Sequence, residues 1–348
     1  MIPEARRYDI DWLRVIAIAL LLVYHIGIGF QPWGVFIGFI QNDRQIDSLW
    51  VPMSMLNVWR IPLLFFVSGM GVCFAMRKRN LKMLLLERSR RILLPFLFGI
   101  IAIVPVHIFL WKLYYRQDIS YSISQGHLWF LANIFSYVLL LSPVLFYFKK
   151  NHNGRIHKIL QSLYGSPLGL LSVSVIFVAE ALILAPETYE AYSLTLHGYI
   201  LGLLSFFFGF SFVYAGSSFW ETILRWRWII LTLALSLFIT RCIVFDLQSP
   251  AYLKAFESNL WIFSAFGFAY RYLNRPSPAL KYLTRAAYPV YIVHMIFLYL
   301  GSYLVMPADL PAAFKLIIII TVTFAGCLIS YEYIIRRTKI MRLFFGLK

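Results

Sequence analysis

Ten apolar segments, each long enough to cross a bilayer, dominate this chain. A helix needs about 20 consecutive apolar residues to cross the hydrocarbon core of a membrane. Segments of this kind occupy approximately residues 10–30, 53–76, 92–115, 127–148, 166–186, 197–216, 226–247, 254–273, 286–306 and 313–335. Only 14% of the residues are charged, whereas soluble domains carry about 25%. The sequence therefore predicts an all-α fold, a polytopic integral membrane bundle of about ten transmembrane helices.

The ten segments form one domain in this prediction. No internal repeat, low-complexity linker or separate soluble domain interrupts residues 1–348. The three cysteines, Cys73, Cys242 and Cys327, lie in or at the end of apolar segments, and their spacing matches no zinc or redox motif. The first segment lacks a small-residue cleavage site, which favours a retained helix over a cleaved signal peptide. We therefore expect a single membrane domain with neither a metal nor a bound cofactor.

The basic residues predict the orientation of the chain. Alternate loops hold 24 of the 32 lysines and arginines, in the segments 6–7, 77–91, 149–158, 225–227, 271–285 and 336–348. The opposite loops hold few bases and several acids. Because cytoplasmic loops are enriched in Lys and Arg, both termini are expected in the cytoplasm, in a cell (inner or plasma) membrane. The net charge of +17 is thus a topology signal that needs no nucleic-acid partner.

An arginine and a histidine share one face of the first predicted helix. Arg14 and His25 are eleven residues apart, and every residue between them except Tyr24 is aliphatic. At about 100° per residue, eleven steps end about 20° from three full turns and about 16 Å along the axis. Such residues are costly in a membrane helix unless their face meets protein or water. This face is therefore expected to line a polar path through the bilayer.

Four further polar residues in or beside the apolar segments are candidates for substrate binding. Arg60 opens the second segment, and either contacts substrate or extends its charged end to the membrane surface. Ser68, followed by Gly69, either binds substrate or forms a small-residue contact between helices. His127 begins the fourth segment and His294 lies inside the ninth. A lone histidine in an apolar helix is usually a hydrogen-bonded packing residue, so both interpretations stay open.

Two arginines before the third segment predict an anion site. Arg88 and Arg91 are three residues apart, so a helix places them on one face at the membrane surface. The simpler interpretation is contact with anionic lipid headgroups together with the topology signal. The alternative is a phosphate clamp, because guanidinium groups match phosphate oxygens in pairs.

These motifs resemble acyltransferase family 3, a family of integral membrane proteins. The family includes O-acetyltransferases of bacterial surface polysaccharides and the succinyltransferase of periplasmic glucans. Its R-x10-H signature matches Arg14 and His25, and its R-x-x-R signature matches Arg88 and Arg91. The further matching runs are 65–69 (FFVSG), 126–130 (GHLWF) and 288–294 (YPVYIVH). All five motifs occur in the family's order, and together they cover nearly the whole chain.

The resemblance implies transfer of an acyl group from a cytoplasmic thioester, usually coenzyme A, to a hydroxyl group. The acyl group is expected to be acetyl or succinyl-like, with acetyl-coenzyme A as the donor and a glycan, another envelope component or a small molecule as the acceptor. His25 is the expected general base, since histidine has a suitable pKa for removing a hydroxyl proton. Arg14 would hold a polar part of the donor or stabilise the oxyanion, and Arg88 and Arg91 would bind the phosphates of coenzyme A. Trp33 in the first outer loop either contacts a sugar or anchors the chain at the membrane interface.

Other classes of protein are also compatible with charged residues inside apolar segments. The main alternative is a transporter or flippase of a polar substrate, which also needs an intramembrane polar path. A structural or sensory membrane subunit is a third class, but it gives no reason for aligning His25 with Arg14. The chain has no phosphate-binding glycine loop, no G-x-S-x-G elbow and no paired-histidine metal helix. Transfer of an acyl group from acyl-coenzyme A would distinguish the enzyme from both alternatives.

Overall fold

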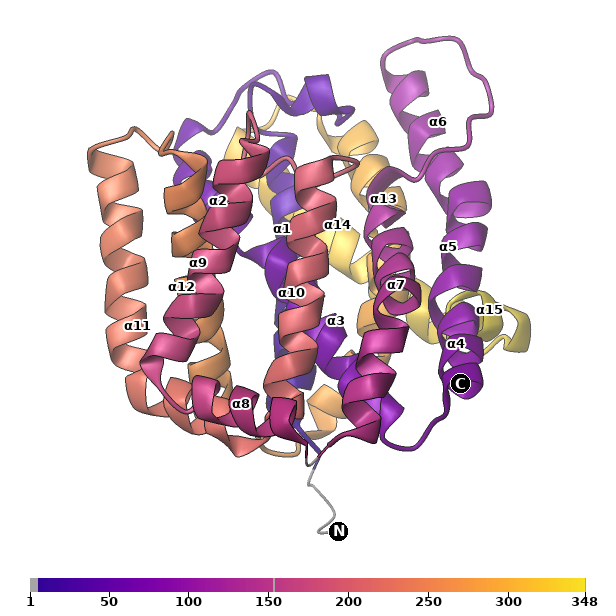
Figure 1. The fold of residues 1–348 in the computed structure, drawn as a ribbon. Coiled ribbons are helices and arrows are strands. Elements are labelled where there is room, and N and C mark those ends of the chain that lie inside the picture. Colours follow the sequence, from indigo (N-terminus) through magenta and orange to yellow (C-terminus); the bar gives the residue numbers. More distant parts are fainter. Residues whose placement is uncertain (1–5, 153, 348) are drawn as a thin grey trace. The chain divides into compact units, whose positions relative to one another are not determined.

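The computed structural model describes residues 6–152 and 154–347, and this part of the chain is helical and contains no strand (Figure 1). Helices occupy all ten predicted segments, which confirms the all-α fold. Nine helices among the described residues are long and apolar enough to cross a membrane. The helix at the remaining segment, α12 (Ala251–Tyr272), is not among the nine. Its buried face carries Glu257, Ser258 and Asn259, which lower its hydropathy.

The described residues form two compact units, each assembled from three stretches of chain. Unit 1 comprises the described residues of Met1–Ala17, Ser54–Leu86 and Asn133–Lys281. Unit 2 comprises Ile18–Met53, Glu87–Ala132 and the described residues of Tyr282–Lys348. The helices α1 (Tyr8–Ile28), α2 (Trp50–Asn57), α4 (Leu81–Arg88), α7 (Trp129–Lys150) and α13 (Pro278–Val305) contribute residues to both units.

Unit 1 is a bundle of long helices. Its complete helices are α3 (Arg60–Met76), α8 (Arg155–Tyr164), α9 (Pro167–Leu184), α10 (Leu196–Tyr214), α11 (Ser217–Ile243) and α12. Helix α10 packs against α3 and α9, and α12 packs against α9 and α11 (Figure 1). The short helix α8 contacts α9, α10 and α11. A buried ion pair joins α11 to α12, in which Arg241 Nε donates to Glu257 at 2.8 Å and Nη2 donates to the same carboxylate at 3.0 Å.

Helices α3 and α10 approach so closely that glycine is required on each. A Cβ atom at Gly69 would overlap the carbonyl oxygen of Phe206, and a Cβ at Gly209 would overlap the carbonyl oxygen of Phe66. In both cases the obstacle is backbone, which cannot rotate away as a side chain can. The predicted small-residue contact at Gly69 is therefore confirmed. Ser68 beside it donates its hydroxyl to Leu64 O at 2.7 Å, within its own helix.

We expect Gly69→Ala to destabilise the fold, because the added methyl group meets backbone of the neighbouring helix. Overpacking of this kind costs about 1–3 kcal/mol. Thermal unfolding of the purified protein in detergent, compared with Gly71→Ala on the same helix, measures the effect. At Gly71 the nearest atom to an added Cβ is the end of the Arg14 side chain at 3.4 Å, an ordinary contact. Equal unfolding temperatures for the two variants would contradict this account of the α3–α10 contact.

Unit 2 contains shorter and less regular helices around a core of aliphatic and aromatic side chains. Its complete elements are η1 (Gly34–Ile37), η2 (Asp47–Leu49), η3 (Ser89–Leu93), α5 (Leu94–Phe98), η4 (Gly99–Ile103), α6 (Val104–Tyr114), η5 (Gly126–Leu128), α14 (Ala312–Ile329), η6 (Ser330–Ile335) and α15 (Lys339–Phe344). The core includes Phe30 and Phe39 from the first part of the unit, and Leu298, Tyr299 and Ile319 from α13 and α14.

Two π-turns interrupt the continuous helix Leu81–Tyr114. Each of them, η3 and η4, ends two residues before a proline, Pro95 or Pro105. A proline ring collides with the carbonyl four residues earlier, and a wider turn removes this collision. The two carbonyls concerned, of Arg91 and Ile101, lie inside the π-turns, and Ile101 O accepts a hydrogen bond from the hydroxyl of Tyr121 at 2.8 Å. The prolines thus set the geometry of the segment that carries Arg91.

Candidate active site

Unit 2 brings four imidazole rings together. They come from four elements: His25 from α1, His107 from α6, His127 from η5 and His294 from α13. The rings of His25 and His294 stack with an interplanar angle of 12° and centroids 5.2 Å apart. His127 lies edge-on to His294 at 4.9 Å, and His107 lies 5.6 Å from His127. These four residues are called the histidine cluster below.

A direct hydrogen bond joins His25 and His294, which are the first and the last histidine of the cluster along the chain. His25 Nδ1 and His294 Nε2 are 2.9 Å apart, although 269 residues separate them along the chain. His294 is fully buried, whereas His25 is half-buried. His25 also contacts the ring of Phe39, with centroids 5.8 Å apart. The surrounding core of unit 2 therefore holds both rings in place while one of them keeps some access to solvent or ligand.

The hydrogen bonds around His294 determine which nitrogen of His25 is basic. His294 Nδ1 lies 2.6 Å from the carbonyl oxygen of Tyr291, and a carbonyl oxygen only accepts, so Nδ1 carries the proton. In the neutral ring, His294 Nε2 is then the acceptor, and His25 Nδ1 donates to it. This leaves Nε2 as the basic nitrogen of His25, which is the arrangement needed for a general base.

His127 is tied to the same turn of α13. Its Nε2 donates to Ile292 O at 3.1 Å, and its own carbonyl oxygen accepts a hydrogen bond from the Tyr291 hydroxyl at 2.5 Å. Its Nδ1, like Nδ1 of His107, is buried and has no hydrogen-bond partner among the described residues. Two buried imidazole nitrogens without a partner are unusual, because burying an unpaired polar group is costly.

The predicted site residues are distributed over both units. His25, His127 and His294 lie in the histidine cluster of unit 2, whereas Arg14, Arg60 and Ser68 belong to unit 1. Arg14 lies on α1 eleven residues before His25 and faces Asp11, with Nη1 3.6 Å from the carboxylate. Arg60 is only 2% exposed at the start of α3, so its guanidinium group lies inside the protein.

Trp33, the predicted sugar contact in the first outer loop, lies in unit 2 outside the histidine cluster. It packs edge-on against Trp50, with ring centroids 5.6 Å apart. The two indoles contact the hydrophobic core of the unit and are only partly buried. Both the role in sugar binding and the role as an interface anchor therefore stay predictions.

The two arginines of the predicted phosphate clamp share a carboxylate. Glu87 lies 3.6 Å from Arg88 Nε and 3.2 Å from Arg91 Nη1. Arg88 ends α4, and Arg91 lies in the π-turn η3. A phosphate group that binds both guanidinium groups would replace or join this carboxylate. The shared partner brings the two cations together in the absence of a ligand.

His107 was not among the site residues predicted from the sequence. No motif accompanies it, and it lies inside the third apolar segment, seven residues before Tyr114 at the end of α6. A separate inspection of every ionisable residue inside the apolar segments would have identified it. Among the described residues, no group of three or more His, Cys, Asp or Glu side chains is arranged to hold a metal ion.

The fold is that of a multi-pass membrane protein, and unit 2 holds a buried cluster of four histidines. The family model described as an acyltransferase domain matches residues 7–332 of this chain. The chain therefore belongs to acyltransferase family 3, and it is a membrane acyltransferase. Searches of curated proteins and of solved structures found no match.

Proposed function

We propose that the protein transfers an acyl group, acetyl or succinyl-like, from acyl-coenzyme A to a hydroxyl group of a glycan or of another envelope or small-molecule acceptor. Acetyl-coenzyme A is the proposed donor. One observation supports this function above the others: the hydrogen bond between His25 Nδ1 and His294 Nε2. It leaves the opposite nitrogen of His25 basic, in a residue that matches the R-x10-H signature of the family.

The proposed reaction uses His25 as general base and then as general acid. His25 Nε2 removes the proton of the acceptor hydroxyl while the hydroxyl oxygen attacks the thioester carbonyl. The C–S bond breaks as the tetrahedral intermediate collapses, and His25 returns the proton to the leaving thiolate. The products are an ester and free coenzyme A. His294 orients the base, and Nδ1 of His127 and of His107 are proposed acceptors for other hydroxyl groups of the substrate.

Arg14 is the proposed ligand for a polar part of the donor or for the developing oxyanion. Its guanidinium group is planar and offers several donors in a fixed arrangement, which suits an anionic oxygen. Arg60 and Ser68 are proposed substrate contacts in unit 1, and Trp33 is a proposed sugar contact. The acceptor class is tested by mass spectrometry of surface glycans and small glycosides from cells with and without the gene. Loss of an ester-linked acyl group in the deletion strain supports the proposal, and an unchanged acylation pattern contradicts it.

The donor site is proposed to include Arg88 and Arg91. We expect replacement of both by glutamine to weaken acyl-coenzyme A binding with little change in the rate at saturating donor. Each charge-assisted hydrogen bond contributes about 1.5–3 kcal/mol, so the apparent affinity should fall about a hundredfold or more. Titration of a coenzyme A analogue into the purified protein measures the affinity.

The matched control for this pair is the double replacement Lys82→Gln with Arg90→Gln. It removes the same charge from the same helix at two exposed positions. If the control and the Arg88–Arg91 variant bind the analogue equally well, the two arginines are topology or lipid-binding residues, and the donor site lies at another basic loop.

The protein is proposed to lie in the inner or plasma membrane of the cell, with both termini in the cytoplasm. The distribution of 24 of the 32 basic residues over alternate loops supports this orientation. Single cysteines introduced at the exposed positions Asp43 and Asn80 should react with an impermeant thiol reagent from opposite sides, with Asp43 outside. Labelling of both positions from one side would contradict the topology.

A further inference from the structure

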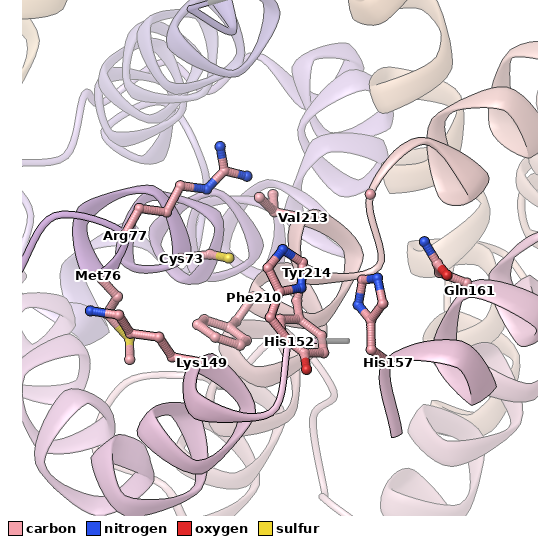
Figure 2. A pocket seen from close by; sticks show the side chains of 11 residues that line it. Cys73, Met76, Arg77, Lys149, His152, His157, Gln161, Phe210, Val213 and Tyr214 are labelled. Carbon is pink, nitrogen blue, oxygen red and sulfur yellow. The ribbon is translucent and has the colours of Figure 1, made fainter. Parts of the chain in front are cut away.

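A second polar site, separate from the histidine cluster, lies within unit 1. A pocket of about 220 Å³ opens at the ends of α3, α7, α8 and α10 (Figure 2). Four basic side chains line it: Arg77 after α3, Lys149 at the end of α7, His152 in the following turn and His157 on α8. None of the pocket's lining residues in the described part of the chain carries a carboxylate. The pocket therefore has a strongly positive character.

The two imidazoles of the pocket form a pair. The rings of His152 and His157 are perpendicular, at 89°, with centroids 4.7 Å apart. Both rings also contact the ring of Tyr214, at 5.5 Å and 5.0 Å (Figure 2). The Tyr214 hydroxyl donates to Phe148 O at 2.9 Å and to Asn151 O at 3.1 Å, which fixes the turn that carries His152.

His157 carries a polar atom that the protein itself does not use. The residue is only 8% exposed, and its Nδ1 has no hydrogen-bond partner among the described residues. Figure 2 shows the imidazole extending from α8 toward His152 and Tyr214. Burial and, second, the neighbouring imidazole of His152 lower the pKa of His157 from its usual value. Without a ligand, the ring is therefore neutral near pH 7.

We propose that this pocket binds a phosphate monoester. Two permanent cations and two imidazoles match a phosphate group that carries about −1.5 to −2 charge at neutral pH. Lys149 Nζ donates one hydrogen bond to Arg79 O at 2.8 Å, and an ammonium group has three donors. The remaining lining includes Cys73, Phe210 and Val213. These apolar side chains suit the organic part next to the phosphate. The volume is below the range of about 300–1,000 Å³ that drug-sized ligands occupy, so the pocket fits a headgroup-sized fragment and not a whole coenzyme.

Charge at the membrane surface alone does not account for this pocket. A topology signal needs lysine and arginine in the loop, but it does not need a buried imidazole with an unpaired nitrogen, nor a second imidazole packed against it. Lys149 and Lys150 separate the two explanations. Both contribute to the loop charge, but only Lys149 lines the pocket, and Lys150 is exposed.

Equilibrium binding to the purified full chain in detergent tests the proposal, with isothermal titration as the measurement. The probes are dihexanoyl phosphatidic acid and glycerol 3-phosphate, which both carry a phosphate monoester, and dihexanoyl phosphatidylcholine, which does not. We expect saturable binding of at least one phosphate monoester. Lys149→Gln should weaken this binding about tenfold, since one charge-assisted contact is lost. The control Lys150→Gln should change the affinity by less than about twofold.

A second variant keeps the test informative if Lys149→Gln unfolds. Arg77→Gln removes the other permanent cation at an exposed position and should also weaken binding about tenfold. Thermal unfolding of each variant shows whether the fold is intact.

Preference for phosphatidic acid over glycerol 3-phosphate would identify a lipid headgroup as the ligand, and equal affinities would identify a soluble phosphate ester. Tight binding of phosphatidylcholine, or equal affinities for wild type, Lys149→Gln and Lys150→Gln, would overturn the proposal.

Binding should also depend on pH. The imidazole of His152 is in contact with His157, and Arg77 and Lys149 are the other basic residues that line the pocket. Tyr214 and Gln161 are neutral residues of the same lining. A bound dianion favours the protonated form of His157, so binding takes up a proton and tightens as the pH falls toward the lowered pKa of His157. His157→Gln should bind more weakly and show a smaller pH dependence than wild type. The same pH dependence in wild type and in His157→Gln would remove His157 from the site.

Discussion

Replacement of His25 by alanine is expected to lower the rate of acyl transfer by about 10²–10⁴-fold, the usual contribution of a general base. The residue lies on α1 with Nδ1 bonded to His294, so its Nε2 is the basic nitrogen of the proposed reaction. Since His25 is only half-buried, the smaller side chain should leave insertion and folding intact. The rate of ester formation by the purified protein measures the effect, and circular dichroism checks the helix content.

The control for this variant is Val23→Ala, an exposed position on the same helix. It tests whether shortening any side chain of this part of α1 lowers activity. Near-normal turnover by His25→Ala, or an equal loss in Val23→Ala, would exclude His25 as the base.

The second large effect is expected at His294, which acts on the reaction through His25. Asparagine can replace the Nδ1–H that bonds to Tyr291 O, but it does not reach His25. Glutamine places an amide oxygen near the position of Nε2 and can still accept the proton of His25 Nδ1. We therefore expect His294→Asn to lower the turnover number by at least about tenfold, because the tautomer of the base is no longer fixed. His294→Gln should retain more activity than His294→Asn.

The comparison of these two variants separates a positioning role from a packing role. A positioning role predicts a lower turnover number and an altered pH profile with little change in the KM for acyl-coenzyme A. If His294 only fills space in the core, both variants should lose stability and activity together. Equal activity of the Asn and Gln variants at equal stability would contradict the proposal that the hydrogen bond from His294 orients His25.

The helices of this protein could be predicted from hydropathy, because a membrane span requires a long apolar run that is visible in one sequence. This holds for α12 as well, which occupies the predicted segment 254–273, although the polar residues on its buried face lower its hydropathy. Hydropathy could not predict the ion pair that this helix makes. Glu257 is paired with Arg241 of α11. The two residues are 16 positions apart in the sequence and lie on different helices, so no local sequence pattern predicts their ion pair.

The candidate site could be predicted only in part. His25 and His294 were each identified from local motifs, but no local pattern shows that residues 269 positions apart share a hydrogen bond. His107 was missed because it has no motif around it, although it completes the histidine cluster. The pairing of Arg88 and Arg91 with Glu87 follows from helical spacing and a neighbouring position, and inspection of the acid beside the two arginines would have suggested it.

The central claim is that this protein forms an ester from acyl-coenzyme A with His25 as the base. The most direct measurement is incubation of purified wild type and His25→Ala in nanodiscs with labelled acetyl-coenzyme A and a glycan acceptor. Free coenzyme A and acylated glycan are quantified together. The account predicts that wild type releases coenzyme A and acylated glycan in equal amounts, whereas His25→Ala releases neither above background. Equal product formation by both proteins would contradict the role of His25. Movement of unmodified glycan across a vesicle membrane by wild type, without any ester formation, would instead indicate a transporter.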